Sequence, residues 1–167
     1  ATWERPDDVG STGLIDDRPV LEIDVVSDIV CPWCFIGKRQ LDAALAQRLA
    51  ARPDAAPPRV RWRAYQLNPD LPAEGVSREE HYRRKFGNAA ATMVERVRTA
   101  GQSIGLELQL DRITRQPNTL AAHALIELAA EGDLQSALAE ALFQAFFLEG
   151  RDPADLAVLL AIATGVG

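Results

Sequence analysis

The sequence has few cysteines, no long apolar run and no excess of positive charge. Only two of its 167 residues are cysteines, and they lie three positions apart. A small secreted scaffold held together by disulfides needs more cysteines at wider spacing, so that class is disfavoured. No apolar run approaches the roughly 20 residues that a membrane-spanning helix needs. The formal net charge of -6 argues against a nucleic-acid or anionic-membrane surface.

The N-terminal segment also lacks the features of a secretory signal. It is polar from Ala1 to Pro19 and has no basic start, apolar core or small-residue cleavage site. We therefore expect residues 1–20 to form a loose extension, and we favour a cytoplasmic protein. Because the chain does not begin with Met, an already removed signal stays compatible with the sequence.

The chain does contain enough apolar residues for one ordinary domain, with 47% hydrophobic and 25% charged residues. The branched residues from Leu21 to Val26 predict a strand, and alternation over residues 60–66 predicts a second one. Between them, a helical apolar pattern follows Cys34. A strand, a helix and a strand in this order predict a parallel pair joined by a right-handed crossover.

The second half of the chain is mainly helical in pattern. Ser77 and Glu80 match a capping box after a proline-rich loop. The alternating leucines over residues 106–110 fit either a strand or an extended connection. Further helices are predicted over residues 119–130 and 134–148, and a last one with Asp152 as N-cap and Pro153 at its first position. The fold class predicted is α/β, a β-α-β unit followed by a helical block.

Cys31, Pro32, Trp33 and Cys34 stand at the start of the first predicted helix. Proline suits the first helical position because its missing N–H would have no helical partner there. Cys31 is then at or beside the N-cap, where free N–H groups and the helix dipole favour a thiolate. Cys34 lies one turn further on. This arrangement predicts Cys31 as the exposed nucleophile and Cys34 as the more buried resolving thiol.

Other interpretations of the cysteine pair are weaker. A structural bridge across so short a loop stabilises a fold little. A closed zinc site needs four ligands, and His81 and His123 have no recognisable spacing to the cysteines, so no metal is expected. Two inert core cysteines would make the Pro32-Trp33 dipeptide at a helix start a coincidence.

Four segments carry a more specific pattern: SDIVCPWCFIGKRQL at 27–41, WRAYQLNPDLP at 62–72, QPNTLAAH at 116–123 and LFQAFFLEGRD at 142–152. This pattern resembles the FrnE-type members of the DsbA-like dithiol oxidoreductases. The resemblance implies a thioredoxin-like β-α-β portion over residues 21–72, with a helical domain over residues 73–167 inserted after the second strand. It also gives Cys31 the nucleophilic role, Cys34 the resolving role, and Pro32 and Trp33 the role of a tuning dipeptide.

The resemblance also implies parts that this sequence does not contain. Family members continue into two more strands and a final helix, with a cis-proline loop that lies against the active-site disulfide. Here the last proline is Pro153 and the last residue is Gly167. We therefore expect either that the natural protein is longer or that a piece is missing from this sequence.

A few other residues are candidates for the site. Asp28, three residues before Cys31, could accept a proton or modulate the thiolate, although a loop or capping role is favoured. Asn118 fits helix capping, with a place in a cleft as the alternative. His123 fits a helix-surface residue paired with Glu127 four positions on, with a role in a cleft as the alternative. Lys38 and Arg39 fit a solvated helix face, and Phe143, Phe146 and Phe147 fit the core or a cleft facing the cysteines.

The function predicted is dithiol–disulfide exchange on protein or small-molecule substrates through Cys31. No metal or organic cofactor is required, and glutathione is a candidate redox partner. One rival is a glutathione-dependent isomerase or transferase of the chromene-carboxylate isomerase or kappa class, whose members carry serine at the place of Cys31. A second rival is a peptide-binding module with incidental cysteines. The sequence predicts neither the substrate nor the oligomeric state.

Overall fold

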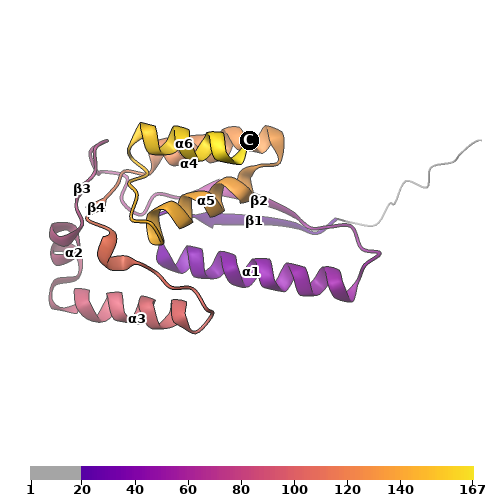
Figure 1. Ribbon diagram of the computed structural model, residues 1–167, viewed down its shortest axis with the longest axis horizontal. Helices are drawn as coiled ribbons and strands as arrows, with labels where there is room; N and C mark the ends of the chain where they lie inside the picture. Colours follow the sequence, from indigo (N-terminus) through magenta and orange to yellow (C-terminus); the bar gives the residue numbers. More distant parts are fainter. Residues whose placement is uncertain (1–19) are drawn as a thin grey trace, which may run out of the picture.

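The computed structural model describes residues 20–167, and Figure 1 shows the arrangement of its elements. The N-terminal extension predicted over residues 1–20 lies outside the described residues, apart from Val20. The predicted α/β class is confirmed, with two strand pairs and a larger set of helices among the described residues.

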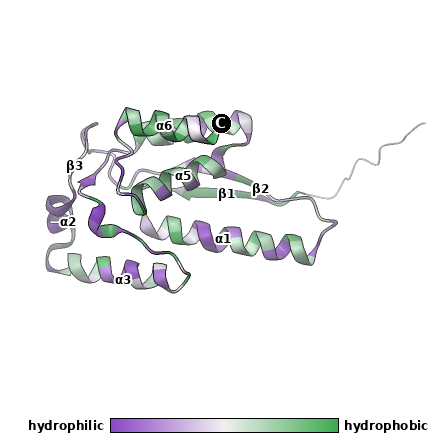
Figure 2. Ribbon diagram, in the orientation of Figure 1, coloured by the Kyte–Doolittle hydropathy of each residue, from purple (hydrophilic) through white to green (hydrophobic). Residues whose placement is uncertain are grey.

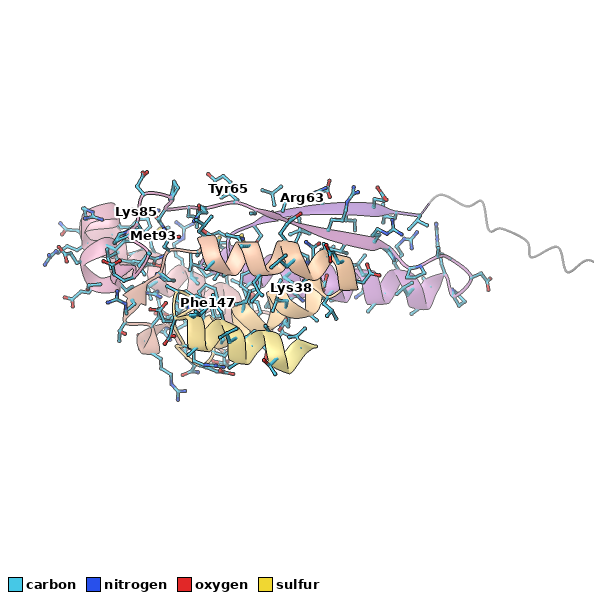
Figure 3. The ribbon with its side chains drawn as sticks, turned by 90° about the horizontal axis from the view of Figure 1, so that it is seen from above. Lys38, Arg63, Tyr65, Lys85, Met93 and Phe147 are labelled. Carbon is cyan, nitrogen blue, oxygen red and sulfur yellow. The ribbon has the colours of Figure 1, made fainter. Side chains whose placement is uncertain are left out.

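The β-α-β unit forms as the sequence predicts. Strand β1 spans Glu22–Ser27, helix α1 spans Pro32–Ala51, and strand β2 spans Arg59–Ala64. The strands pair in parallel, with Ile23 opposite Val60 and Val25 opposite Trp62. Burial alternates along β1, and Trp62 is the buried residue of β2, so one face of the pair packs inward. Arg63 lies on the outer face with Tyr65 just beyond β2, and Figure 3 shows both side chains pointing away from the helices.

The remaining chain is mostly helical. Its long helices are α2 (Arg78–Phe86), α3 (Ala90–Gln102), α4 (Leu120–Leu128), α5 (Gln135–Phe147) and α6 (Leu156–Val166). Short elements join them: β3 (Val76–Ser77), β4 (Arg115–Gln116) and the 3₁₀ turns η1 (Gly87–Ala89), η2 (Leu110–Arg112) and η3 (Ala129–Gly132). In Figure 1, α2 and α3 lie together beside the N-terminal end of α1.

The start of α2 is held by a close turn and a cap. β3 and β4 pair antiparallel, with Val76 opposite Gln116. Gly75 precedes them at φ +70, and a Cβ there would lie 2.5 Å from the carbonyl oxygen of Gln116, so only glycine fits this turn. Ser77 then caps α2, because its Oγ accepts a hydrogen bond from the backbone N of Glu80 at 3.4 Å. The predicted N-cap at Ser77 is thus confirmed.

The structure settles the form of residues 106–110 and corrects the predicted start of the last helix. Leu106 and Leu108 lie in an extended connection, not a strand, and Leu110 begins η2; all three leucines are buried against the core. The last helix does not begin at Pro153. The Asp152 carboxylate instead accepts a hydrogen bond from the Ala154 N–H, which makes a turn. Asp155 is the N-cap of α6, since its Oδ1 accepts from the Ala157 N–H at 2.8 Å.

The core lies between α1, α5 and the inner face of the strands. Phe35 of α1 stacks on Phe143 of α5 with ring centroids 5.1 Å apart, and Trp62 of β2 meets Phe143 edge-on at 6.1 Å. The Gln135 side chain accepts a hydrogen bond from the Trp62 backbone N at 3.0 Å, and the Trp62 indole N–H donates to Ser136 at 3.0 Å. These contacts fix α5 across the β-α-β unit.

Lys38 is not the solvated residue that its sequence position suggests. Its side chain is buried and lies 2.7 Å from Asp42 and 2.8 Å from Glu140. Arg39 also contacts Glu140 and lies over the Phe35 ring, 5.2 Å from its centroid. The Glu140 carboxylate on α5 thus holds two cations of α1, which explains how charged residues enter a mainly apolar interface.

Hydropathy varies strongly among the helices. Figure 2 shows α6 as mainly hydrophobic and α2 as mainly hydrophilic. Among residues 20–167, no helix is both long enough and apolar enough to cross a membrane.

Candidate functional site

The cysteine pair stands at the N-terminus of α1, as predicted. Cys31 is the N-cap and Pro32 is the first helical residue. The Cys31 N–H donates to the Asp28 carbonyl at 3.0 Å, which closes the turn between β1 and α1. The Cys31 carbonyl accepts from the N–H of Cys34 at 3.0 Å. Local chain geometry therefore places both thiols on the first turn of the helix.

The two thiols differ in surroundings more than in burial. Both are free and half-buried, so the predicted contrast between an exposed and a buried thiol is smaller than expected. Cys31 lines a cavity, while Cys34 packs against the hydrophobic core. Trp33 between them is 47% exposed and borders the same cavity. The open space beside the pair is therefore on the Cys31 side.

The thiols shift one another's pKa in opposite directions. A hydrogen bond with Cys31 lowers the pKa of Cys34 from 9.0 to about 6; burial opposes this shift, and the Ser27 hydroxyl assists it. The same hydrogen bond raises the pKa of Cys31, and burial and the neighbouring charge raise it further. Near neutral pH the reduced pair therefore holds one proton and one negative charge.

The two shifts belong to the pair as a whole, so the expectation that Cys31 has a low pKa stays a prediction for the thiol without its partner. Cys31 does cap the helix, and the backbone N–H groups of Trp33 and Cys34 lower its pKa. In the pair, the hydrogen bond between the sulfurs has the larger effect and raises the pKa of Cys31. Since the remaining proton lies between the two sulfurs, its transfer to Cys34 leaves the thiolate on Cys31.

A buried polar pair supports the turn that carries Cys31. Asp28 is 1% exposed, and its Oδ2 accepts a hydrogen bond from the Leu67 N–H at 2.7 Å. Its Oδ1 lies 3.2 Å from Nε2 of His123 on α4. His123 is 6% exposed, so it is not the helix-surface partner of Glu127 that its sequence position favours. Asp28 likewise does more than cap a loop, because it joins the loops that follow β1 and β2 to α4.

The other predicted cleft residues do not line the cavity beside Cys31. Asn118 accepts a hydrogen bond from the Leu120 N–H at 2.9 Å and donates to the Leu71 carbonyl at 2.7 Å, so it serves as a helix cap and a loop clamp. Phe143, Phe146 and Phe147 are core residues with 2% exposure or less. None of these side chains lines the cavity beside Cys31, and neither does His123.

The cavity beside Cys31 has a volume of about 220 Å³. We call it the Cys31 cavity. Its walls are the start of α1, the loop after β2, helices α2 and α3, and the segment near β4. Most of its lining is apolar or aromatic, including Tyr82, Phe86, Met93 and Val97. Figure 3 shows Met93 and Lys85 at the end of the molecule that α2 and α3 form.

The family of the chain follows from comparison with known proteins. The sequence profile of the DSBA-like thioredoxin domain matches residues 22–167. The chain belongs to this DSBA-like family. The resemblance seen in the sequence is thereby confirmed at family level, whereas the FrnE type stays a prediction.

Two relatives show how much of a DSBA-like protein this chain represents. The YwbO protein of Bacillus subtilis (strain 168) is 24% identical over 152 residues, which are 88% of this chain and 66% of YwbO. The structure of a probable DsbA oxidoreductase from Streptomyces coelicolor matches with a TM-score of 0.72 and 26% identity, over 88% of this chain and 63% of that one. The chain thus spans about two thirds of these relatives, and its fold is the DSBA-like thioredoxin fold with a helical insertion.

Several residues of this DSBA-like site were missed by the sequence analysis. Arg78, His81, Tyr82, Lys85 and Phe86 all lie on α2 and all line the Cys31 cavity. Their spacing of three and four positions places them on one helical face. The sequence pattern that could have predicted this cavity wall is the row of cations and aromatic rings along a hydrophilic helix.

The arrangement offers thiol chemistry and no clustered metal ligands. Among residues 20–167, no group of three or more His, Cys, Asp or Glu side chains could hold a metal ion. His81, considered above as a zinc ligand, lies on the wall of the Cys31 cavity instead.

Proposed function

We propose that this DSBA-like chain exchanges disulfides through Cys31, with Cys34 as the resolving thiol. The observation that carries the proposal is the pair of free thiols on the first turn of α1, one facing a cavity and the other packed inward. The lowered pKa of one thiol supports it, because the thiolate is the form that attacks a disulfide.

The first step is attack on a substrate disulfide. With the shared proton on Cys34, the Cys31 thiolate forms a bond to one substrate sulfur, and the substrate S–S bond breaks. One half of the substrate leaves as a thiolate, and the other half stays on Cys31 as a mixed disulfide. Cys31 has the role of nucleophile here because its side chain borders the cavity.

The second step resolves the mixed disulfide. Cys34 loses its proton to the departing thiolate or to water and attacks the Cys31 sulfur. A bond between Cys31 and Cys34 forms, the mixed disulfide breaks, and the second half of the substrate leaves as a thiolate that takes up a proton from water. The substrate has then gained two electrons and the protein pair has lost two; the reverse sequence oxidises a substrate dithiol.

Residues around the pair tune these steps. The Asp28 carboxylate raises the pKa of Cys34 through its charge, although its effect is smaller than that of the bond with Cys31. The backbone N–H of Asp28 lowers the same pKa by a larger amount, so Asp28 as a whole favours the thiolate. Pro32 and Trp33 border the cavity and shape access to Cys31. Glutathione fits as a redox partner because it supplies a small thiol or disulfide.

Trapping of the mixed disulfide tests the proposal. Cys34→Ser should accumulate a covalent adduct with a small disulfide, seen as a mass increase of the intact protein that a reductant reverses. Cys31→Ser should give no adduct and no exchange activity. An adduct on the Cys31→Ser protein but not on the Cys34→Ser protein would reverse the roles, and no adduct on either would reject thiol exchange.

A further inference from the structure

The Cys31 cavity is positively charged in a protein that carries an overall negative charge. The chain has a formal net charge of -6. Yet among the described residues the cavity is lined by Arg78 and Lys85 and by no Asp or Glu. The overall negative charge would repel anions, so the positive charge at this site comes from the cavity residues themselves.

Arg78 is the more unusual of the two cations. It is 9% exposed, and its guanidinium lies over the Tyr82 ring, 4.5 Å from the centroid. Among residues 20–167, no carboxylate oxygen forms an ion pair with it, and Asp111 acts on it only as a distant charge. Burial lowers its pKa from the ordinary value, yet arginine stays protonated in proteins. A buried cation without a paired anion is costly, so it favours an anion supplied from outside.

His81 adds an unused polar atom to the same wall. It is 7% exposed, and its Nδ1 is buried without a hydrogen-bond partner among the described residues. Burial and the neighbouring Lys85 and Arg84 lower its pKa, so the ring is neutral at neutral pH and contributes a hydrogen bond, not a charge. Lys85 is held toward the loop after β2 by a 3.2 Å bond to Asn68.

We propose that Arg78, with His81 and Lys85, forms a carboxylate-binding subsite for the substrate whose sulfur reacts with Cys31. The inference rests on the proposed exchange at Cys31. Planar guanidinium groups pair well with carboxylates, and the apolar lining fits the carbon chain between the carboxylate and the sulfur. The volume of about 220 Å³ lies below the range of about 300–1,000 Å³ of pockets for larger ligands. The subsite thus accepts a small acidic group.

Three small disulfides of different charge test the subsite. Dithiodipropionate is anionic, hydroxyethyl disulfide is neutral and cystamine is cationic. The rate of adduct formation on the Cys34→Ser protein is measured for each and divided by the rate with a small reference thiol, which removes intrinsic reactivity. We expect the order anionic, neutral, cationic. Arg78→Gln should lower the rate for the anion roughly tenfold, the size of one charge-assisted hydrogen bond, and change the neutral rate less than about twofold.

Arg83→Gln is the matched control. Arg83 lies on the same helix, is exposed and does not line the cavity, so it removes the same charge outside the subsite. If Arg83→Gln lowers the anion rate as much as Arg78→Gln, the effect is general electrostatics and the subsite is rejected. Circular dichroism checks that both variants fold. If Arg78→Gln does not fold, the order of adduct rates for the three disulfides without that substitution, together with the anion rate of Lys85→Gln, tests the subsite.

The same assay separates the origin of the carboxylate and the two proposals. Disulfide-linked peptides with Asp or Asn beside the cysteine show whether Arg78 also raises the adduct rate of an acidic protein segment. A higher rate for the Asp peptide supports the subsite with a protein as the source of the carboxylate. A higher rate for dithiodipropionate but not for the Asp peptide supports the subsite with a small molecule as the source. Equal corrected rates for all charges reject the subsite but leave exchange intact. No adduct with any disulfide rejects the exchange itself.

Discussion

The carboxylate of Asp28 and the imidazole of His123 meet in the interior, with Oδ1 3.2 Å from Nε2, although 95 positions separate the two residues. Asp28 is 1% exposed and also holds the Leu67 N–H at 2.7 Å. Its backbone carbonyl accepts the Cys31 N–H at 3.0 Å. One residue thus links α4, the loop after β2 and the first turn of the cysteine helix.

Loss of His123 should destabilise the protein strongly. His123→Ala leaves the Asp28 Oδ1 without a partner in the interior, and a buried polar atom left without its hydrogen bond costs about 1–3 kcal/mol. Because Asp28 keeps the Leu67 N–H, we expect about 2 kcal/mol, measured by urea unfolding of the oxidised protein.

Glu127→Ala is the control for this prediction, because Glu127 is exposed four positions from His123. It should change the free energy of unfolding by less than about 0.5 kcal/mol. Asp28→Asn combined with His123→Ala should cost less than the sum of the two single changes. Additive costs would show that the pair is not coupled in solution.

The reduced cysteine pair should lose its first proton near pH 6. The hydrogen bond with Cys31 lowers the pKa of Cys34 to about 6, so thiolate absorbance should show one group titrating there and a second only well above 9.0. Cys31→Ala removes the largest cause of the lowering, because alanine has no side-chain donor, and the pKa of Cys34 should rise.

The Cys34→Ser protein tests Cys31 alone. Without the Cys34 sulfur, the main causes that raise the pKa of Cys31 disappear, while the Trp33 N–H still lowers it. We expect its apparent pKa below the free-cysteine value of about 8.5. A value at or above that of free cysteine would show that the helix N-terminus does not activate this thiol.

The stability of the reduced protein should depend on pH through the same pair. The pKa of Cys34 is about 6 in the folded state against an ordinary value of 9.0, so the unfolded chain binds more protons between these values and stability rises with pH there. The pKa of Cys31 is raised, so above 9.0 the sign reverses and stability falls. The oxidised protein has neither thiol and serves as the reference; parallel curves for both forms between pH 6 and 9 would contradict the shifts.

The reduction potential should lie between those of thioredoxin and DsbA, about -270 and about -120 mV. Stabilisation of the thiolate stabilises the reduced form and makes the disulfide more oxidising. Here the thiolate is stabilised by the partner thiol and the Ser27 hydroxyl, and the Pro32-Trp33 dipeptide adds no cation. Equilibration with glutathione buffers followed by thiol alkylation measures the potential. A value as oxidising as that of DsbA would require a further stabilising group.

Local signals in the sequence were enough to predict the cysteine helix. Pro32 at the first helical position and Ser77 as N-cap depend on backbone groups within a few residues, so their sequence patterns were sufficient. Asp155 shows the limit even of local patterns. Asp152 before Pro153 looks like a helix start, but its carboxylate closes a turn and the helix begins one turn later.

The sequence by itself determined the parallel β-α-β unit and the position of both thiols at the start of α1, because alternation, helical period and capping are local properties of the chain. Tertiary structure alone decided that His123 meets Asp28, that Lys38 is buried against Glu140, and that a face of α2 charges the Cys31 cavity. The reason is physical: burial and charge pairing depend on partners far away in the sequence, and a side chain of the same type is a surface residue or a buried one according to what packs against it.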